Sequence, residues 1–246
     1  MFQGYYDLAS NMITQNRNMN IISNNISNVS TPGYKEDRLM ESTFREEMIY
    51  RYDQYGKTQV GTVSRMNIAD ERVTDYSEGG LRETGGALDV GLTGNGFFVV
   101  QTNNGVVYTR NGSFNLDDQR YLVLPGIGRV QGVNGPIQLT TDEVAIDTQG
   151  NITTEDGLQY FGRLQVVDFA DYTQLTKITG GVFQAAAAPQ ASNATVNQQY
   201  TEYSNVNMAE QMTRMMSGQR VLQGSAQILK IYDQLVGKIV TIGSAT

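Results

Sequence analysis

The sequence predicts an α+β fold: long N- and C-terminal helices pair as a coiled coil around a central antiparallel β-rich domain, barrel- or sandwich-like. Heptad-spaced apolar residues occupy both ends of the chain. Between them, short β segments alternate with turn residues at intervals of about 8–12 residues, without helical periodicity. We expect a terminal helical domain over 1–33 and 204–246, a charged connector or extension over 34–78, a β-rich body over 79–184 and a linker over 185–203.

The N-terminal helix is expected to run from about Gln3 to about Asn28. The residue before Pro32 is disfavoured in the α conformation, so the helix ends before that point. Its apolar residues recur at alternating steps of three and four, and only the step at Gln15 is polar. Such a stripe needs a partner, and the helix at the other end of the chain is the natural candidate. The stripe consists of Tyr5, Leu8, Met12, Met19, Ile22, Ile26 and Val29.

The segment that follows the first helix has weaker patterns. From Tyr34 to about Met48 it is charged and partly amphipathic, which predicts an extended start and then a short helix. From Tyr50 to Tyr76 it is polar, and alternation over 60–66 is compatible with a strand.

The middle of the chain is predicted to be almost entirely β. Apolar runs at 97–100 and 106–108 flank an Asn-Asn-Gly turn at 103–105, and Asn-Gly between two such runs is a strong hairpin indicator. Related turn pairs occur at 111–112 and 149–150. This pattern favours an antiparallel barrel or sandwich over an α/β fold.

The C-terminal helix is expected to begin at Asn207. Asn207 and Glu210 have the spacing of a capping box, in which each side chain accepts from a backbone N–H group of the first turn. About 35 residues at about 1.5 Å each give a helix of roughly 50 Å. Its apolar line shifts after Gly224, which makes a wide face suited to more than one neighbour. The line contains Met208, Met212, Met215 and Leu222 before the shift, and Ile228, Tyr232, Leu235 and Ile239 after it.

Composition argues against several classes of function. The 246 residues have a formal net charge of -7 and scattered Lys and Arg, which argues against binding to nucleic acid. The chain has no Cys, His or Trp, so it lacks the residues of disulfides, ordinary catalytic triads and typical zinc sites. We expect no catalytic residue, no cofactor and no metal.

Two further patterns are attributed to turns. The adjacent acids at 117–118, 142–143 and 155–156 would point to opposite faces of a strand, so none forms a natural acid/base pair. The glycines over 85–96 lack the GxGxxG spacing and lead into a strand, unlike a phosphate-binding loop. Arg110 is interpreted either as a bridge between subunits or as a solvent-facing charge.

Neither a cleavable signal nor a membrane span is expected. The start, MFQGYYDLAS, has no positive region followed by an apolar run. No apolar run approaches the roughly 20 residues of a membrane helix. The first helix has only Asp7 and Arg17 as charges before Lys35, whereas helices at membrane surfaces are usually rich in Lys or Arg. If the protein leaves the cell, it would therefore need a route other than the general secretory one.

Three blocks of the sequence resemble the bacterial flagellar axial proteins, the rod and hook family. The first is SNNISNVSTPGYK over 23–35. The second contains LDV at 88–90, GNGFF at 94–98 and YTRNGSF at 108–114. The third is EYSNVN at 202–207 with a downstream Gln-Arg pair. The blocks occur in the family's order, and the chain is identified as a member.

The resemblance implies a non-enzymatic structural subunit of the flagellar basal-body rod. Such subunits are expected to line a helical tube around an export channel with their terminal helices, to carry the β domain outside, and to transmit torque from motor to hook. The implied partners are further copies of the chain, other rod and hook subunits, the flagellar type III export apparatus and the bushing rings around the rod. The length fits a rod subunit better than a hook protein, and the proximal and distal rod types both stay open.

The resemblance also marks residues for subunit assembly. Seven Asn between Asn11 and Asn28 would bond between subunits or line a wet channel, and a merely solvated face is the alternative. The marked residues are Asn24, Asn25, Asn28, Pro32, Gly33 and Tyr34 in the first block and Asn205, Val206, Asn207, Gln219 and Arg220 in the third.

Three alternative functions are weighed. A hook-type or hook-adaptor subunit is the nearest, and a secreted β-rich adhesin or binding module with oligomerising helices is more remote. A carboxylate-dependent glycosidase is the most distant. An adhesin usually carries a secretory signal, and a glycosidase needs paired acids and usually aromatic platforms. The sequence has neither the signal nor any Trp.

Overall fold

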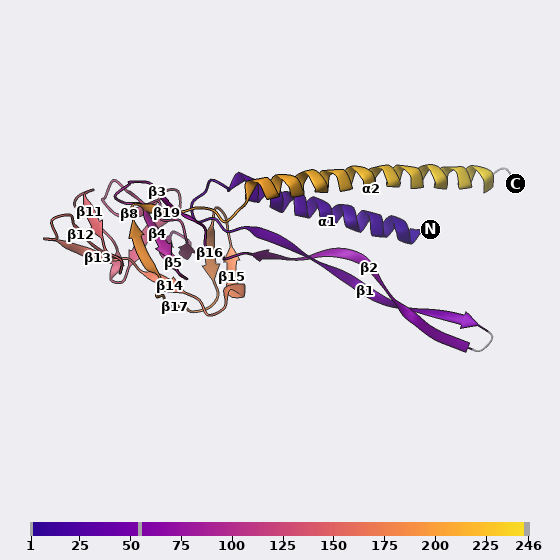
Figure 1. Ribbon diagram of the computed structural model, residues 1–246, viewed down its shortest axis with the longest axis horizontal. Coiled ribbons are helices and arrows are strands. Elements are labelled where there is room, and N and C mark those ends of the chain that lie inside the picture. The colour runs from indigo at the N-terminus through magenta and orange to yellow at the C-terminus, as the bar shows by residue number, and fades with distance from the viewer. Residues whose placement is uncertain (1, 54–55, 244–246) are drawn as a thin grey trace. The chain divides into compact units, whose positions relative to one another are not determined.

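The structure contains a long helix at each end of the chain, and the sequence between the helices forms mainly β strands, an α+β arrangement (Figure 1). It is a computed structural model that describes residues 2–53 and 56–243, with side chains described outside 2–3, 41–70 and 239–243. Contacts divide the chain into two units. We call the first the terminal unit (Met1–Ile26, Asp37–Asp75 and Asn207–Thr246) and the second the β body (Ser27–Glu36 and Tyr76–Val206).

Both predicted helices are present in the terminal unit. Helix α1 spans Phe2–Ser27 and helix α2 spans Met208–Gly243. Asn207 caps α2 as expected, because its Oδ1 accepts hydrogen bonds from the N–H groups of Ala209 (3.1 Å) and Glu210 (3.3 Å). Glu210 does not make a described return bond to the cap. Its Oε1 pairs with Arg214 at 2.5 Å instead.

A long hairpin completes the terminal unit. Strands β1 (Asp37–Asp53) and β2 (Gly56–Thr74) pair antiparallel along their whole length, with register shifts after Met40 and Ile49. The short helix expected before Met48 is therefore wrong, because its residues lie within β1. Continuous pairing across the hairpin outweighs the weak helical periodicity of this segment.

The β body is built from short antiparallel strands. A ten-stranded sheet has the order β15-β16-β6-β5-β9-β8-β7, with β10 added to β9, β14 to β5 and β17 to β14. A three-stranded sheet β11-β12-β13 and the pairs β18-β4 and β19-β3 complete it. The strands are β3 (Leu81–Glu83), β4 (Val90–Thr93), β5 (Phe97–Thr102), β6 (Gly105–Thr109), β7 (Asn115–Leu116), β8 (Leu122–Leu124), β9 (Gly128–Gly132), β10 (Gly135–Pro136), β11 (Val144–Ile146), β12 (Asn151–Thr154), β13 (Tyr160–Arg163), β14 (Val166–Asp168), β15 (Leu175–Lys177), β16 (Val182–Ala185), β17 (Gln190–Ala191), β18 (Thr195–Gln198) and β19 (Tyr200–Glu202), with a 3₁₀ turn η1 at Tyr172–Gln174.

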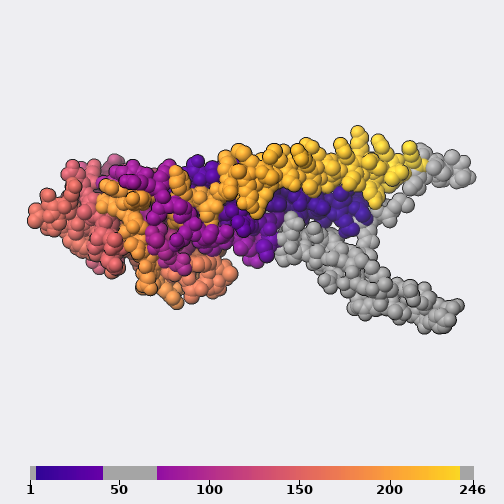
Figure 2. Space-filling model, viewed as in Figure 1, coloured from indigo at the N-terminus to yellow at the C-terminus, as the bar shows by residue number. Residues whose placement is uncertain are grey.

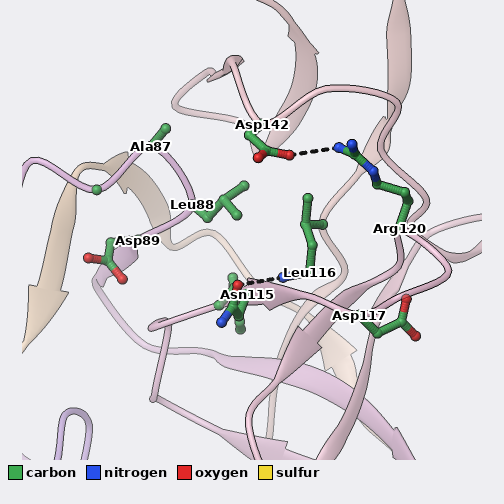
Figure 3. Close-up of a pocket in the computed structure, with 10 residues that line it drawn as sticks. Ala87, Leu88, Asp89, Asn115, Leu116, Asp117, Arg120 and Asp142 are labelled. Carbon is green, nitrogen blue, oxygen red and sulfur yellow. Dashed lines mark hydrogen bonds and ion pairs between the residues drawn. The ribbon is translucent and has the colours of Figure 1, made fainter.

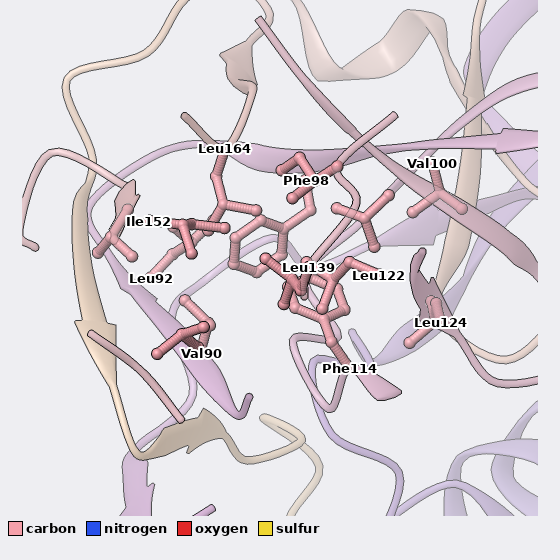
Figure 4. Close-up of a cluster of buried hydrophobic side chains, with 14 of the residues drawn as sticks. Val90, Leu92, Phe98, Val100, Phe114, Leu122, Leu124, Leu139, Ile152 and Leu164 are labelled. Carbon is pink, nitrogen blue, oxygen red and sulfur yellow. The ribbon is translucent and has the colours of Figure 1, made fainter. Parts of the chain in front are cut away.

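Strand β5 lies between the two hydrophobic clusters of the body. Successive side chains of a strand point to opposite faces. Phe98 and Val100 accordingly belong to the larger cluster, which Figure 4 shows closing around Phe98, and Phe97 and Val99 belong to the smaller, aromatic one. A strand that is buried on both faces explains why FFVV is a continuous apolar run.

The glycines at the three predicted turns have different structural roles. The hairpin at 103–105 is confirmed, because β5 and β6 pair up to Thr102 and Gly105. Gly150 also turns the chain, with a φ of 81° and its N–H donating to the carbonyl of Asp147. Gly112 serves close packing: a Cβ there would lie 1.7 Å from the carbonyl oxygen of Val90.

The segment expected as a connector over 185–203 contains β17, β18 and β19, which pair with strands of the body. Ser192 of this segment packs closely against the body, because an ideal Cβ on Gly96 would lie 2.6 Å from its hydroxyl oxygen. Neither described helix has an apolar stretch long enough to cross a membrane.

Candidate assembly site

The TPGYK segment that ends the first sequence block makes a tight turn inside the β body. The N–H of Thr31 donates to the carbonyl of Asn28 at 3.0 Å, and that of Gly33 donates to the carbonyl of Glu202 at 2.8 Å. Gly33 has a φ of 65°, a conformation that L side chains rarely adopt. A Cβ on Gly33 would lie 2.4 Å from the carbonyl carbon of Arg110. Only glycine fits this position.

The residues after Gly33 are buried in the same unit. Tyr34, Lys35 and Glu36 are all inaccessible to solvent. Lys177 covers this segment, because its ammonium lies 3.6 Å from the centre of the Tyr34 ring and donates to the carbonyl of Lys35 at 2.6 Å. The described contacts of Gly33 and Tyr34, both expected at subunit contacts, are thus made within their own chain.

A buried charge cluster joins the three sequence blocks. Lys35 from the first block and Arg110 from the second both contact Glu202 from the third, at 2.6 Å and 3.2 Å. Glu202 also accepts the N–H of Gly79 at 2.9 Å, and Lys35 donates to the carbonyl of Ser77 at 2.6 Å. The side chains of Lys35 and Glu202 are each 1% exposed. One carboxylate therefore holds together the start, the middle and the end of the β body.

The cluster has two cations for one central anion. Burial disfavours the charged ammonium of Lys35 and lowers its pKa, although contact with Glu202 opposes this effect. Arg110 donates from Nη2 to the carbonyl of Gly94 at 2.7 Å and lies over the ring of Phe97, while its Nε has no hydrogen-bond partner among the described residues. Both interpretations offered for Arg110, an inter-subunit bridge and a solvent-facing charge, are wrong for this structure, because it is buried against its own chain.

The third block is anchored beside this cluster. The Oδ1 of Asn205 accepts the N–H of Glu36 at 2.7 Å, and its amide donates to the carbonyl (3.3 Å) and hydroxyl (3.1 Å) oxygens of Ser77. Val206 is buried next to it. These contacts fix the backbone that leads toward the cap at Asn207.

A second polar anchor lies in the terminal unit. Asn25 is buried, and its side chain makes two bonds to the backbone of Asp37: its amide donates to the carbonyl at 2.8 Å, and its Oδ1 accepts the N–H at 3.1 Å. The same amide lies 3.5 Å from Oε1 of Gln211 in α2. Asn25 thus joins α1, β1 and α2, whereas Asn24 is exposed on α1.

Helices α1 and α2 contact each other in an antiparallel sense. Gly4 of α1 faces the hydroxyl of Tyr232, and Met19 faces Gly218 at 3.5 Å from an ideal Cβ. Apart from Gly224, the residues of α2 that are buried or half-buried recur at alternating steps of three and four. They are Met208, Gln211, Met215, Gly218, Leu222, Ser225, Leu229 and Tyr232.

The predicted stripes only partly coincide with the covered faces. In α1, Ile22 is buried, Tyr5 is exposed, and Leu8, Met12, Met19 and Ile26 are half-buried. In the turn that follows, Asn28, Val29 and Pro32 are half-buried. In α2, Met208, Met215, Leu222 and Tyr232 are half-buried, whereas Met212, Gln219, Arg220, Ile228 and Leu235 are exposed, and the side chain of Ile239 lies outside the described residues.

A groove runs between the two helices and the start of β1. It has a volume of about 450 Å³ and includes Ile21 and Ile22 of α1, Leu39 of β1, and Gly218 and Val221 of α2. A second, open pocket of about 620 Å³ lies in the β body (Figure 3).

Two of the three acids that line the pocket in the β body, Asp117 and Asp142, have partners nearby. Asp142 pairs with Arg120 at 2.8 Å, as Figure 3 shows. The slight burial of Asp117 would raise the pKa of its carboxyl, but hydrogen bonds from the N–H of Tyr121, from Arg129 and from the N–H of Gln119 outweigh it and lower the pKa. A carboxyl of lowered pKa stays ionised near neutral pH and is a poor general acid.

The central position of Glu202 and the contacts of Gln211, Gly218 and Ser225 were not predicted from the sequence. Glu202 was noticed only as part of the third block, although a charge inside an otherwise apolar or polar-neutral motif is a usable indicator of a buried pair. The small and polar residues of α2 on the covered face carry no apolar periodicity, so the pattern of large apolar side chains does not indicate them.

Comparison with known proteins identifies the family. Three family models match: "Flagella basal body rod protein" over 7–35, "Flagellar hook protein FlgE/F/G D1 domain" over 91–154, and "Flagellar basal body rod FlgEFG protein C-terminal" over 197–242. The flagellar basal-body rod protein FlgG of Buchnera aphidicola subsp. Acyrthosiphon pisum is 32% identical, over 92% of this chain and 94% of its own length. FlgG of Bacillus subtilis is 28% identical over 98% and 99%, and FlgF of Caulobacter vibrioides is 29% identical over 93% and 93%.

These matches cover the ends and the middle of the chain in the same order as the three sequence blocks. The family consists of structural proteins rather than enzymes. The chain therefore belongs to the flagellar basal-body rod protein family, as a structural subunit of the rod.

Proposed function

We propose that this subunit assembles with further copies into a helical tube, in which α1 and α2 pair as a coiled coil that lines the export channel and the β body forms the outer layer. One observation carries the proposal: α2 leaves large apolar side chains exposed along its length. They are Met212, Met216, Val221, Ile228, Ile231, Leu235 and Val236. Figure 2 shows the side chains of α2 open on the face in view.

The exposed residues contrast with those that α2 turns toward α1. The buried positions of the covered face are Gln211, Gly218 and Ser225, which bury little apolar surface, and the larger apolar residues of that face are only half-buried. Exposed apolar area of this extent on a soluble protein marks an interaction surface. A tube wall supplies the missing neighbours, since each helix there packs against several others, and flexible Met side chains adapt to such contacts.

The β1–β2 hairpin supports the same proposal. It forms a sheet of two strands only, with 17 residues in β1 and 19 in β2. Isolated two-stranded ribbons are marginally stable in water. We propose that the extension over 34–78 is covered by other subunits in the rod.

We further assign the residues marked by the family blocks to two tasks. Gly33, Tyr34, Asn205 and Val206 fix the turn and the charge cluster within one chain, because their contacts are internal. The exposed residues of α1 and α2 make the contacts between chains. Other rod and hook subunits, the type III export apparatus and the rings around the rod are the expected further partners.

Relatives at 28–32% identity that match more than nine tenths of the chain carry the name FlgG. We therefore propose the FlgG type of rod subunit, with the FlgF type as the alternative because one relative of that name is 29% identical. The segment over 34–78 is expected to separate the rod types.

Imaging of isolated basal bodies tests the proposed function. A tag placed in an exposed loop of the β body, near Leu158, should label the rod along a defined length, on its outer surface. The purified chain should also form tubes in vitro when its concentration is raised. Labelling confined to the hook or to the cell surface would contradict the assignment.

A further inference from the structure

Helix α2 carries a second heptad stripe beside the one that faces α1. Val221, Gly224, Ile228, Ile231 and Leu235 follow one another at steps of three and four. At about 100° per residue, this stripe lies roughly 110° around the helix from the residues that contact α1. Its four large side chains are between 42% and 55% exposed. It therefore has the periodicity of a helix contact, and beyond Val221, which also lines the groove beside α1 and β1, its large side chains are about half exposed.

Gly224 is the distinctive member of the stripe. Glycine is among the least favourable residues inside a helix. For Gly218, a Cβ would lie 3.5 Å from Met19, an ordinary van der Waals contact, so this glycine lies against α1 of its own chain. For Gly224, a Cβ would meet nothing within 4 Å. No described part of this chain accounts for a glycine here, whereas close approach of another backbone would.

Helix α1 exposes apolar side chains at the same level. The contacts of Gly4 with Tyr232 and of Met19 with Gly218 fix the register of the two helices. Tyr6 and Ile13 lie between these contacts and are 62% and 58% exposed. They are seven residues apart and so share one face of α1. The exposed faces of both helices thus face outward over the same length of the pair.

We propose that α1 of a second copy of this chain packs on the α2 stripe, with Ile13 seated over Gly224 and Tyr6 beside Ile228 and Ile231. The inference rests on the proposed function, since all subunits in a tube wall have the same orientation along the tube axis. A neighbour's α1 can then follow the register of the chain's own α1. The stripe continues the contact already present between α1 and α2, and the glycine supplies the hole for a branched side chain.

Site-specific cross-linking tests the contact directly, since the chain has no Cys. Two single variants, Tyr6→Cys and Ile231→Cys, are mixed, assembled into tubes and oxidised. A mixed disulfide dimer is expected, and because each chain carries one thiol it reports a contact between copies. Lys230→Cys in place of Ile231→Cys is the matched control, because it moves the thiol off the stripe by one residue, and its yield should be several-fold lower.

The second test is a substitution that favours the helix but fills the space left by Gly224 on the α2 stripe. Gly224→Ala should leave the helix content of the unassembled chain equal or higher, because Ala favours helix over Gly. It should raise the critical concentration for tube formation by about tenfold, as overpacking of a contact would. Gln223→Ala, on the adjacent exposed position, should leave that concentration unchanged.

The outcomes separate this inference from the proposed function. If the unmodified chain forms no tubes and does not label the rod, the proposed function fails. If tubes form normally, but Gly224→Ala assembles at the unmodified concentration or the control cysteine cross-links as well as the stripe cysteine, only the contact proposed here is overturned.

Discussion

The β body and the terminal unit differ in which side chains they bury. The body encloses one cluster around Phe98 and a second, aromatic one around Phe97. In the terminal unit, the buried side chains of the two helices are mostly polar or small, among them Thr14, Asn25, Gln211 and Ser225, and Ile22 is the buried apolar exception among those described. The body thus has an enclosed apolar core, whereas the helices leave much of their apolar surface exposed.

This difference indicates which region is stable in a single chain and which region needs further contacts. Burial of apolar surface stabilises by about 25 cal/mol per Å², so exposed Ile, Leu and Met side chains represent unrealised stability. Helices with few tertiary contacts are marginal in water. The expected behaviour is a folded β body carrying terminal segments that become ordered on assembly.

The largest expected effect is a change in helix content on assembly. In a micromolar solution of the unassembled chain, the ellipticity at 222 nm should fall well below that of assembled tubes, because neither helix buries its apolar face alone. Circular dichroism measures both forms. The near-ultraviolet signal of the Tyr residues in the body should stay the same and serves as the control.

Equal helix content in the two forms would contradict the proposed difference between a β body that folds alone and helices that become ordered on assembly. It would show that the intrachain contact between α1 and α2 suffices to fold them. The exposed stripe on α2 would then be an ordinary surface of a pre-formed pair.

The two regions also differ in how well the sequence predicts them. The extents of α1 and α2 and the hairpin at 103–105 follow from local indicators: periodicity, the cap at Asn207 and the turn residues. The face by which α2 contacts α1 did not follow, because Gln211, Gly218 and Ser225 carry no hydrophobic pattern. Apolar periodicity indicates which faces of a helix can form contacts. It does not indicate whether the contacting residues belong to the same chain.

Long-range contacts were the other limit. Lys35, Arg110 and Glu202 are far apart in sequence, and nothing local indicates that the three charges meet. The hairpin over 37–74 was missed in part for the same reason, since each strand is weak alone and pairing with the other decides its structure. In the connector over 185–203, strands as short as β17 lie below the length at which periodicity is visible.

The next largest effect is expected from loss of the central anion of the charge cluster. Glu202→Ala leaves Lys35 and Arg110 buried without their shared carboxylate. Removing one partner of a buried pair typically costs about 3–5 kcal/mol. The free energy of unfolding of the β body, measured by urea denaturation with Tyr fluorescence, should fall by about that amount.

An exposed ion pair of the same body provides the control for Glu202→Ala. The side chains of Arg120 and Asp142 are 54% and 74% exposed, so Asp142→Ala should cost less than about 1 kcal/mol. Equal losses for the two variants would show that the cluster does not hold the three blocks together.

A smaller effect is expected at the turn that enters the body. Gly33→Ala adds a Cβ 2.4 Å from the backbone of Arg110 and forces a left-handed conformation. The conformation costs about 1–2 kcal/mol and the overpacking about 1–3 kcal/mol more. Gly85→Ala is a matched control, because Gly85 has a φ of 71° but open space around it, and only the first cost applies. Urea midpoints that coincide for the two variants would rule out a packing role for Gly33.

The smallest effect concerns the polar anchor of the terminal unit. Asn25→Ala removes both side-chain bonds to the backbone of Asp37 and leaves its N–H and carbonyl groups without these partners. Such a loss costs about 1–3 kcal/mol locally, so hydrogen exchange of the Asp37 amide in assembled tubes should accelerate by roughly tenfold or more. The exposed Asn24, changed to Ala, should alter exchange much less. If both variants protect Asp37 as the unmodified chain does, Asn25 does not hold β1 to the helices, and the contrast between a region held by apolar burial and one held by a few polar bonds loses its support in the terminal unit.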